Sequence, residues 1–279
     1  MSDKIERLTR ALRQTPKDPT LYRALALAFR ESGRDALATR AEAMQQEISE
    51  FRSQSFQDLV LDHYIFMGAK GLTFVDIGAH DGISYSNSWF FEKCRDWKGL
   101  CIEANPDVFL SLRENRGCDC VNACISDSDE SSVDFLKVLG RAEMLSGIVS
   151  LYDTRHIARV DDEISMFGGR KEIVKVANHR LSDVLDSREL KEIHLLSIDT
   201  EGAELPILRS IDFKKYFIHA ITVECNFPEL EAQFSAVLAP NDFESVAKLG
   251  ADVIFLNRRS SFKARQNPFD FAPEALDAN

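Results

Sequence analysis

The 279-residue chain has few of the features that mark membrane, secreted or fibrous proteins. No uncharged apolar run approaches the ~18 residues that a membrane-spanning helix needs, and the opening segment, MSDKIERLTR, lacks the apolar core of a signal peptide. Only six cysteines are present and none forms a CxxC pair, which argues against a disulfide scaffold and a thiolate metal site. We therefore expect a cytoplasmic protein with reduced thiols and no membrane span.

Positive charge is also scarce, with 34 Lys and Arg against 45 Asp and Glu and a net charge of −11. Nucleic acids are bound largely through Lys and Arg that neutralise phosphates, so no nucleic-acid partner is expected. The acidic excess falls after residue 50, because residues 1–50 hold 9 basic and 8 acidic side chains. The remaining composition, 44% hydrophobic and 28% charged, is that of a globular protein long enough for one large α/β domain and an appendage.

Residues 1–50 are predicted to form an all-α arm. Its apolar and small residues follow the spacing of a tetratricopeptide unit that begins at Pro19; they are Tyr22, Leu25, Ala26, Phe29, Gly33 and Ala38. A plain helical hairpin is the alternative. Because a single unit of this kind cannot bury its apolar faces alone, we expect the arm to pack on the rest of the chain, form a homodimer or bind a protein partner.

The next patterned segment indicates a site for a nucleoside-containing cofactor. A short apolar strand, residues 72–77, is followed by a glycine loop, 78–82, and a helix, 87–95. A second strand, 99–102, leads to Glu103. This order lets a backbone approach a ligand closely, while an acid after the second strand can accept hydrogen bonds from ribose hydroxyls.

Charge within this segment favours S-adenosylmethionine over a dinucleotide. Asp76 at the strand end and Asp81 in the loop would repel a diphosphate, whereas they suit an amino group and a sulfonium. The loop also has His80 where dinucleotide sites have another glycine. The sequence therefore predicts a methyl donor as the cofactor.

Several motifs together resemble the FkbM-type methyltransferase family, a group of class I S-adenosylmethionine-dependent enzymes. They are SQSFQD, FVDIGAHDG, SYSNSWFFE, WKGLCIEANP, RGCDCVNACIS and LLSIDTEGAELPILRSIDF. The resemblance covers residues 51–279 and implies a doubly wound, mostly parallel, seven-stranded Rossmann-like α/β sheet of the class I methyltransferase type. Known members transfer methyl groups mostly to hydroxyls of sugars, polyketides and related products.

The resemblance implies a set of donor-binding residues, to which the charge argument adds Asp81. The set is Gln54, Gln57, Asp58, Asp76, Gly78, Asp81, Gly82, Ser86, Asn87, Glu103, Ala104, Asn105, Cys124, Ile125 and Ser126. Within this set, the resemblance implies that Glu103 binds the ribose and that residues 124–126, at the end of the third strand, lie along the edge of the adenine. Residues 54–58 are expected on a helix that leads into the first strand. For Asp76, Asn87 and Gln54 the alternative is a purely local role, as caps or as a solvated side chain.

The acceptor is expected at the same edge of the sheet. A buried strand, residues 193–198, ends at Asp199, and Glu201 follows. Ligands of open α/β sheets bind beyond the carboxyl ends of the strands, so these acids should face the donor loop. Asp199 is the first candidate for base or acceptor-orienting residue, and Glu201 is the second.

Two alternatives stay open for this acidic edge. Asp199, Glu224 and Asn226 could bind Mg²⁺, which prefers oxygen ligands, although acids at strand ends are equally often helix caps. His156 could act as the base instead; it falls in a predicted amphipathic helix, residues 153–166, placed to form a lid over the acceptor.

The sequence thus predicts an S-adenosylmethionine-dependent O-methyltransferase that acts on a small-molecule or glycan acceptor. A sugar hydroxyl of a glycan or glycolipid precursor, or of a secondary metabolite, is the expected target. The competing hypotheses are a nucleotide-dependent oxidoreductase, an inactive binding module that recruits partners through the arm, and N-methylation of a protein or amine.

Overall fold

A computed structural model describes residues 2–15 and 17–264, which form two compact units. One unit holds the N-terminal helices, residues 58–68 and the described residues after 262; the other holds residues 52–57 and 69–262. The sequence analysis places a single boundary after residue 50. In the structure, residues 58–68 also belong to the helical unit.

The helical unit contains the predicted all-α arm. Its helices are α1 (Ser2–Gln14), α2 (Pro19–Glu31), α3 (Asp35–Glu47) and α4 (Gln57–Val60), the last running into a π-helix (Leu61–Phe66). Asp18 caps α2 by accepting a hydrogen bond from the Thr20 N–H at 2.8 Å. Gly33, at φ +74°, makes the turn between α2 and α3. Among the buried side chains of these two helices are Tyr22, Leu25, Ala26, Phe29, Ala38, Ala41 and Met44.

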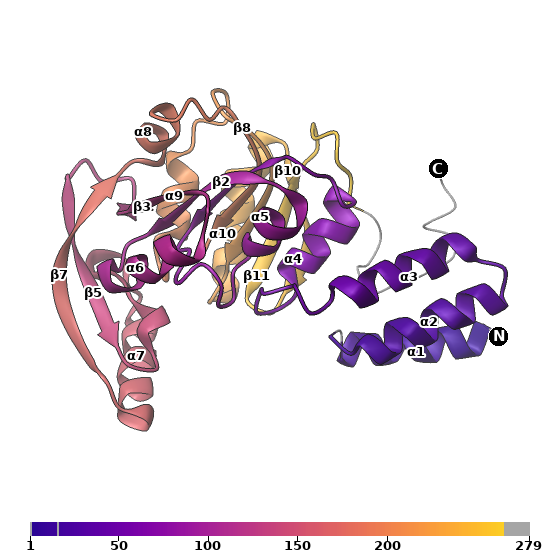
Figure 1. Cartoon of the computed structure of the whole chain (residues 1–279). Helices are drawn as coiled ribbons and strands as arrows, with labels where there is room; N and C mark the ends of the chain where they lie inside the picture. The colour runs from indigo at the N-terminus through magenta and orange to yellow at the C-terminus, as the bar shows by residue number, and fades with distance from the viewer. Residues whose placement is uncertain (1, 16, 265–279) are drawn as a thin grey trace. The chain divides into compact units, whose positions relative to one another are not determined.

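The larger unit is built on the predicted doubly wound sheet (Figure 1). Its strands are β1 (Thr73–Ile77), β2 (Lys98–Glu103), β3 (Asp119–Asn122), β8 (Glu192–Ile198), β9 (Phe217–Glu224), β10 (Phe243–Leu249) and β11 (Asp252–Asn257). They lie in the order β10-β11-β9-β8-β1-β2-β3. The five strands from β9 to β3 are parallel and β11 is antiparallel to both neighbours, which confirms the mostly parallel seven-stranded sheet.

Helices flank this sheet on both faces (Figure 1). They are α5 (Trp89–Arg95), α6 (Pro106–Asn115), α8 (Leu181–Asp186), α9 (Glu204–Ser210) and α10 (Pro228–Leu238). Because side chains alternate along a strand, Val75 and Ile77 join the main apolar core. Asp76, between them, points to the opposite face and receives a hydrogen bond from Ser88, the residue before α5.

A second sheet, which the sequence analysis did not predict, occupies the segment between β3 and β8. It has four strands in the order β4-β7-β5-β6: β4 (Cys124–Ile125), β5 (Ser132–Leu139), β6 (Gly147–Ile148) and β7 (Arg170–His179). The predicted lid helix is α7 (Thr154–Phe167) and precedes β7. Cys124 and Ile125 therefore belong to the second sheet. The expectation that they end the third strand is wrong, because β3 stops at Asn122 and the chain then pairs with β7.

Among the described residues, no helix has both the length and the apolar character needed to cross a bilayer.

Candidate functional site

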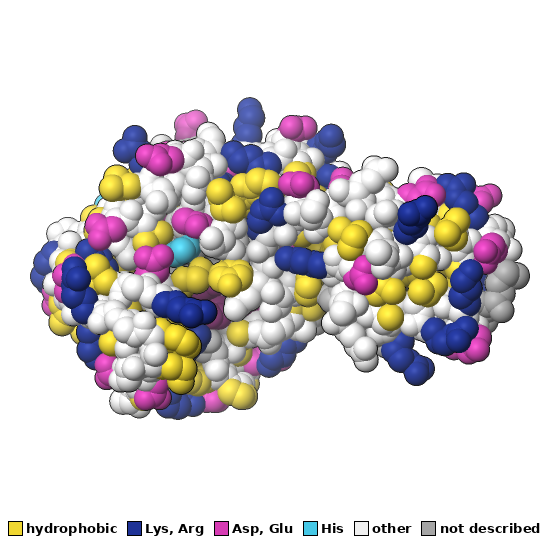
Figure 2. All heavy atoms as spheres, turned by 60° about the horizontal axis from the view of Figure 1, so that its bottom comes forward, with side chains coloured by type: hydrophobic (Ala, Val, Ile, Leu, Met, Phe, Trp, Pro, Cys, Tyr) yellow, Lys and Arg dark blue, Asp and Glu magenta, His cyan; other side chains and the backbone are white. Residues whose placement is uncertain are grey.

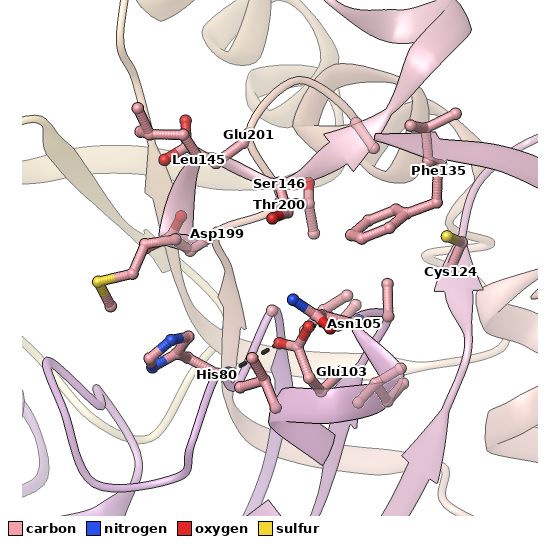
Figure 3. Close-up of a pocket in the computed structure, with 18 of the residues that line it drawn as sticks. His80, Glu103, Asn105, Cys124, Phe135, Leu145, Ser146, Asp199, Thr200 and Glu201 are labelled. Carbon is pink, nitrogen blue, oxygen red and sulfur yellow. Dashed lines mark hydrogen bonds between the residues drawn. The ribbon is translucent and has the colours of Figure 1, made fainter. Parts of the chain in front are cut away.

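A cavity lies at the point where the strand order reverses, between β1 and β8. Ligands bind there in doubly wound sheets because the loops on either side diverge and leave a crevice. Residues from the carboxyl ends of β1, β2, β8 and β9 line the cavity, together with residues of the second sheet (Figure 3). On the surface of the larger unit, Figure 2 shows a hollow with hydrophobic side chains along its rim and acidic side chains deeper inside.

The floor of this cavity is the contact between two strand ends. The Asp199 N–H donates a hydrogen bond to the Ile77 carbonyl at 2.9 Å, which holds the end of β8 against the end of β1. Gly78 follows at φ +86° and lies against the Asp199 backbone with no room for a side chain. Glycine is therefore required here both for its backbone conformation and for the close approach.

Glu103 lies at one end of the cavity, where Figure 3 shows it beside Asn105. Its Oε2 accepts a hydrogen bond from the His80 N–H at 2.8 Å, and its Oε1 accepts one from the Asn105 N–H at 2.7 Å. Burial raises the pKa of Glu103, although these backbone donors favour its charged form. Each carboxylate oxygen keeps a lone pair that can accept a ligand hydroxyl.

Three acids, which we call the acidic group, gather at the other end: Asp199, Glu201 and Glu224. Each offers a carboxylate oxygen within 4.8 Å of the others. The Asn226 amide donates hydrogen bonds to Glu224 at 2.7 Å and to Glu201 at 3.1 Å. The acids predicted from separate strand ends are thus brought together by the sheet.

Enclosure and mutual repulsion raise the pKa values of the acidic group. Asp199 is accessible from the cavity, yet desolvation by the surrounding protein, together with the negative charge of Glu201, raises its pKa well above the usual range. Burial and the charge of Asp199 raise the pKa of Glu224 in the same way. Burial raises the pKa of Glu201 to about 7, so this carboxyl changes charge near neutral pH.

His156 lies behind Glu201. Its Nδ1 is 3.4 Å from Glu201 Oε2, its Nε2 is 3.2 Å from the Leu145 carbonyl, and its ring stacks on Tyr152 at 4.7 Å. Burial lowers the pKa of His156, which favours the neutral imidazole. His156 thus contacts three neighbours, and together with Glu201 it lines a second hollow beside the cavity.

The loop that carries Glu201 is fixed by Glu204. The Glu204 carboxylate accepts hydrogen bonds from the N–H and hydroxyl of Thr200, both at 2.8 Å, and from the Gly202 N–H at 3.0 Å. Glu201 itself adopts a left-handed conformation, φ +55°, which is uncommon for a residue with a side chain. Such strain concentrates at functional sites, where the surrounding contacts maintain it.

The structure divides the predicted site residues into two groups. Those that line the cavity are Gln54, Gly78, Glu103, Ala104, Asn105, Cys124, Ile125, Asp199 and Glu201. Those that do not are Gln57, Asp58, Asp76, Asp81, Gly82, Ser86, Asn87 and Ser126. Gln54 reaches the cavity from a turn, so its expected place on a helix is wrong; α4 begins only at Gln57.

Most residues of the second group hold the surrounding loops. Asp81 accepts hydrogen bonds from the Ile83 and Ser84 N–H groups and shapes the glycine loop. The Ser86 hydroxyl accepts from the Trp89 N–H at the start of α5. Ser126 donates to the Asn178 side chain at 2.8 Å, joining the segment after β4 to β7.

The rest make contacts that lie away from the cavity. The Gln57 amide donates to Asp252 at 2.5 Å, and the Asn87 amide donates to Ser197 at 3.2 Å. Asp58, in the helical unit, accepts a hydrogen bond from the Leu59 N–H.

Several lining residues were missed from the sequence. Phe135 comes from β5, Leu145 and Ser146 precede β6, and Arg159 reaches the cavity from α7. Only Ser146 had a signal, because Ser-Gly-Ile at 146–148 resembles a short family signature. Arg159 lies on α7, which the sequence predicted as a lid helix without assigning Arg159 a role, whereas Phe135 lies on β5 of the sheet that was not predicted.

The family described as "Methyltransferase FkbM domain" matches residues 76–251. No curated protein matches the chain.

Three solved structures are similar at low identity. The TehB-like SAM-dependent methyltransferase from Corynebacterium glutamicum ATCC 13032 is 10% identical with a TM-score of 0.37, over 79% of this chain and 97% of that chain. Precorrin-6y C5,15-methyltransferase from Geobacter metallireducens GS-15 is 11% identical with a TM-score of 0.33, over 67% and 79%. The mitomycin 7-O-methyltransferase MmcR is 14% identical with a TM-score of 0.34, over 90% and 66%. Similarity this low carries no information on the acceptor. The family match, by contrast, spans more than half of the chain, which therefore belongs to the FkbM family of S-adenosylmethionine-dependent methyltransferases.

Proposed function

We propose that the protein transfers a methyl group from S-adenosylmethionine to a hydroxyl of a small-molecule or glycan acceptor, with a sugar hydroxyl as the target. The observation that supports this proposal is the polarity of the cavity. One end holds a single carboxylate, Glu103, braced by backbone N–H groups, and the other end holds the acidic group.

The Glu103 end suits an adenosine. The free lone pairs of Glu103 can accept hydrogen bonds from ribose hydroxyls. Apolar side chains beside it, those of Val108, Ile125 and Phe135, offer a surface for the adenine ring. Figure 3 shows Phe135 and Cys124 on the side of the cavity away from Asp199.

The acidic end suits positive charge. S-adenosylmethionine supplies its methyl group from a sulfonium and also carries an ammonium, and carboxylates stabilise both. A diphosphate would meet repulsion from the same carboxylates, which argues against NAD(P) and the oxidoreductase hypothesis. The charge of this end therefore favours the methyl donor.

Glu201 is the side chain that we assign as the general base, with Asp199 orienting the acceptor. Glu201 lines the cavity and also a second hollow that opens beside it, so it stands where donor and acceptor would meet. Its pKa of about 7 suits a group that must accept a proton near neutral pH. His156 holds the Glu201 carboxylate and is a positioning residue in this proposal.

The second hollow is the proposed acceptor site. Its walls combine aromatic rings with hydrogen-bonding side chains, among them Tyr152, Phe227, Asn226 and Gln233. Sugar rings are bound by this combination, because their C–H faces pack on aromatic rings and their hydroxyls pair with amides. Holding the acceptor oxygen in line with the methyl group could supply on the order of 7–11 kcal/mol of the barrier reduction.

Isothermal titration of the purified protein with S-adenosylmethionine, S-adenosylhomocysteine and NADPH is the first test. Micromolar binding of the two sulfur nucleosides, without NADPH binding, is the expected result. Binding of NADPH alone would favour the oxidoreductase, and absence of all binding in a folded sample would overturn the proposal.

Acceptor class is tested next with methyl-labelled donor and panels of sugars, amines and proteins. We expect label on a hydroxyl oxygen. Label on nitrogen would replace O-methylation by N-methylation, and donor binding with no labelled product across the panels would favour the binding module.

A further inference from the structure

Three cysteines gather on the face of the main sheet opposite the apolar core. Cys101 of β2 pairs with Cys120 of β3 in the parallel register, and Cys118 precedes β3 on the same face. The Sγ atoms of Cys101 and Cys118 are 3.5 Å apart. Cys101 is fully buried, whereas Cys118 and Cys120 are half-buried and can meet a small solute.

A buried guanidinium lies next to these thiols. The Arg116 side chain is fully buried, forms an ion pair with Glu92, and lies close enough to Cys101 and Cys118 to interact with their charge. Hydrogen bonding with Cys101 and Cys120, together with the positive charge of Arg116, lowers the pKa of Cys118. Thiolates are the reactive form of cysteine, and such surroundings favour them.

Arg116 also supports the glycine loop at the cavity. Its guanidinium donates hydrogen bonds to the Gly82 carbonyl at 3.2 Å and to the Ser88 hydroxyl at 3.0 Å, and Ser88 in turn donates to Asp76. The Arg116 side chain packs so tightly on Gly82 that a Cβ there would lie 2.6 Å from Arg116 Cγ. A shift of Arg116 must therefore disturb the loop that leads out of β1.

We propose that Cys118 and Cys101 form a reversible redox pair that controls the donor loop through Arg116. The oxidant is a hydroperoxide. The Cys118 thiolate attacks one peroxide oxygen, the O–O bond breaks, and the sulfur becomes a sulfenic acid as the peroxide is reduced. The Cys101 thiol then attacks this sulfur, an S–S bond forms, and the hydroxide leaves as water with the Cys101 proton.

Closing this bond draws residues 116–118 toward β2. The two sulfurs must approach from 3.5 Å to bonding distance, and Gly117 is held on the other side by a 2.7 Å hydrogen bond from its N–H to Glu92. The Arg116 guanidinium then loses its hydrogen bonds to the Gly82 carbonyl and the Ser88 hydroxyl. Since this step concerns the donor site, its functional consequence rests on the proposed function, whereas the thiol chemistry does not.

The cross-link is tested by peptide mapping of the full chain treated with hydrogen peroxide. Trypsin separates Cys101, in residues 99–113, from Cys118, in residues 117–137. We expect these two peptides to be joined after oxidation and separated again by dithiothreitol. Cys118→Ser and Cys101→Ser should each abolish the joined peptide, and Cys120→Ser should retain it.

The joined peptide surviving in Cys118→Ser, or only over-oxidised Cys118 without a cross-link, would overturn the redox pair. Cys94→Ser, in α5 and outside the cluster, is the matched control and should behave like the parent chain.

The effect on the loop is measured by titration with S-adenosylhomocysteine before and after oxidation. Oxidation removes the Arg116 hydrogen bonds to the loop, and it should weaken binding roughly tenfold or more in the parent chain. Oxidised Cys94→Ser should show the same loss. Cys118→Ser should bind equally well with and without peroxide. A mapped cross-link with unchanged affinity would overturn the link to the donor loop. A reduced chain that binds no S-adenosylhomocysteine would instead overturn the proposed function, because the cross-link is scored without ligand.

Discussion

Gly78 and Asp199 lie so close that a Cβ on Gly78 would be 1.6 Å from the Asp199 carbonyl oxygen. Gly78 follows β1 and Asp199 follows β8, and these are the two strands at which the sheet order reverses. The contact therefore sets the width of the crevice that holds the donor and acidic ends of the cavity. It also explains why a glycine must stand here, independently of any ligand.

Gly78→Ala should destabilise the larger unit by more than about 3 kcal/mol, because the clash is with backbone that cannot move aside. Thermal or urea unfolding measures the change. Gly168→Ala is the control for backbone strain: Gly168 has φ +75° and ψ 168°, and a Cβ there meets nothing within 4 Å, so only the backbone strain of about 1–3 kcal/mol should appear. Equal losses in the two variants would contradict the role of the contact.

Glu103→Ala should weaken donor binding by about 1–3 kcal/mol, the range for hydroxyls left without a partner. Titration with S-adenosylhomocysteine measures the effect, and an unfolding curve checks that the His80 and Asn105 N–H groups tolerate the loss of their acceptor. Asp162→Ala, an exposed acid on α7, should leave the affinity unchanged. Undiminished binding in a folded Glu103→Ala protein would refute the ribose assignment.

Methyl transfer should speed up as pH rises through about 7. Glu201 must be unprotonated to act as a base, and its pKa is about 7, so the reactive form is scarce at pH 6 and dominant at pH 8. Glu201→Gln should lose this inflection and lower kcat by roughly 10²–10⁴. A pH profile of kcat/KM that keeps its inflection in Glu201→Gln would assign the proton to another group.

The raised pKa values of Glu201 and Asp252 should favour the ligand-free folded chain at pH 6 over pH 8, whereas the lowered pKa values of His156 and His194 act in the opposite direction. The folded-state pKa of Glu201 is raised to about 7 and that of Asp252 to about 6, above the ordinary values of 4.5 and 3.8, so at these two groups the folded chain binds more protons than the unfolded chain in this range. Stability contributed by the protonated forms is therefore lost as pH rises toward 7. Urea unfolding of the parent chain and of Glu201→Gln at the two pH values measures the contribution of Glu201, because the histidines contribute equally to both chains. Replacing Glu201 should remove a loss of stability with rising pH, and an identical pH dependence in the two chains would contradict the raised pKa of Glu201.

Activity should survive exhaustive treatment with EDTA. Although Asp199, Glu201 and Glu224 could hold a divalent cation, the proposed mechanism uses Glu201 as a base and needs no metal. Labelled methyl transfer before and after chelation is the measurement. Loss of activity that Mg²⁺ restores would instead place a cation on these carboxylates.

Local sequence patterns predicted much of the fold because the strands of the main sheet are short apolar runs in the sequence. The strand at 72–77, the glycine loop and Glu103 follow one another within about thirty residues, and β1 and β2 are neighbours in the sheet. Parallel strands buried on both faces need uninterrupted apolar runs, which are visible in one dimension. Asp199 and Glu224 could be placed near Glu103 for the same reason, since parallel strands share a carboxyl edge.

Tertiary structure alone decided which of those residues meet the cavity. Asp76 lies within the apolar run yet points to the opposite face, where it receives the Ser88 hydroxyl, because side chains alternate along a strand. Phe135 and Arg159 reach the cavity from the second sheet and α7, whose contacts bridge long separations in sequence. The 3.5 Å approach of Cys101 and Cys118 likewise depends on the pairing of β2 with β3. Sequence thus determined the strands and the end at which each acid lies, whereas packing between distant segments determined which side chains face one another.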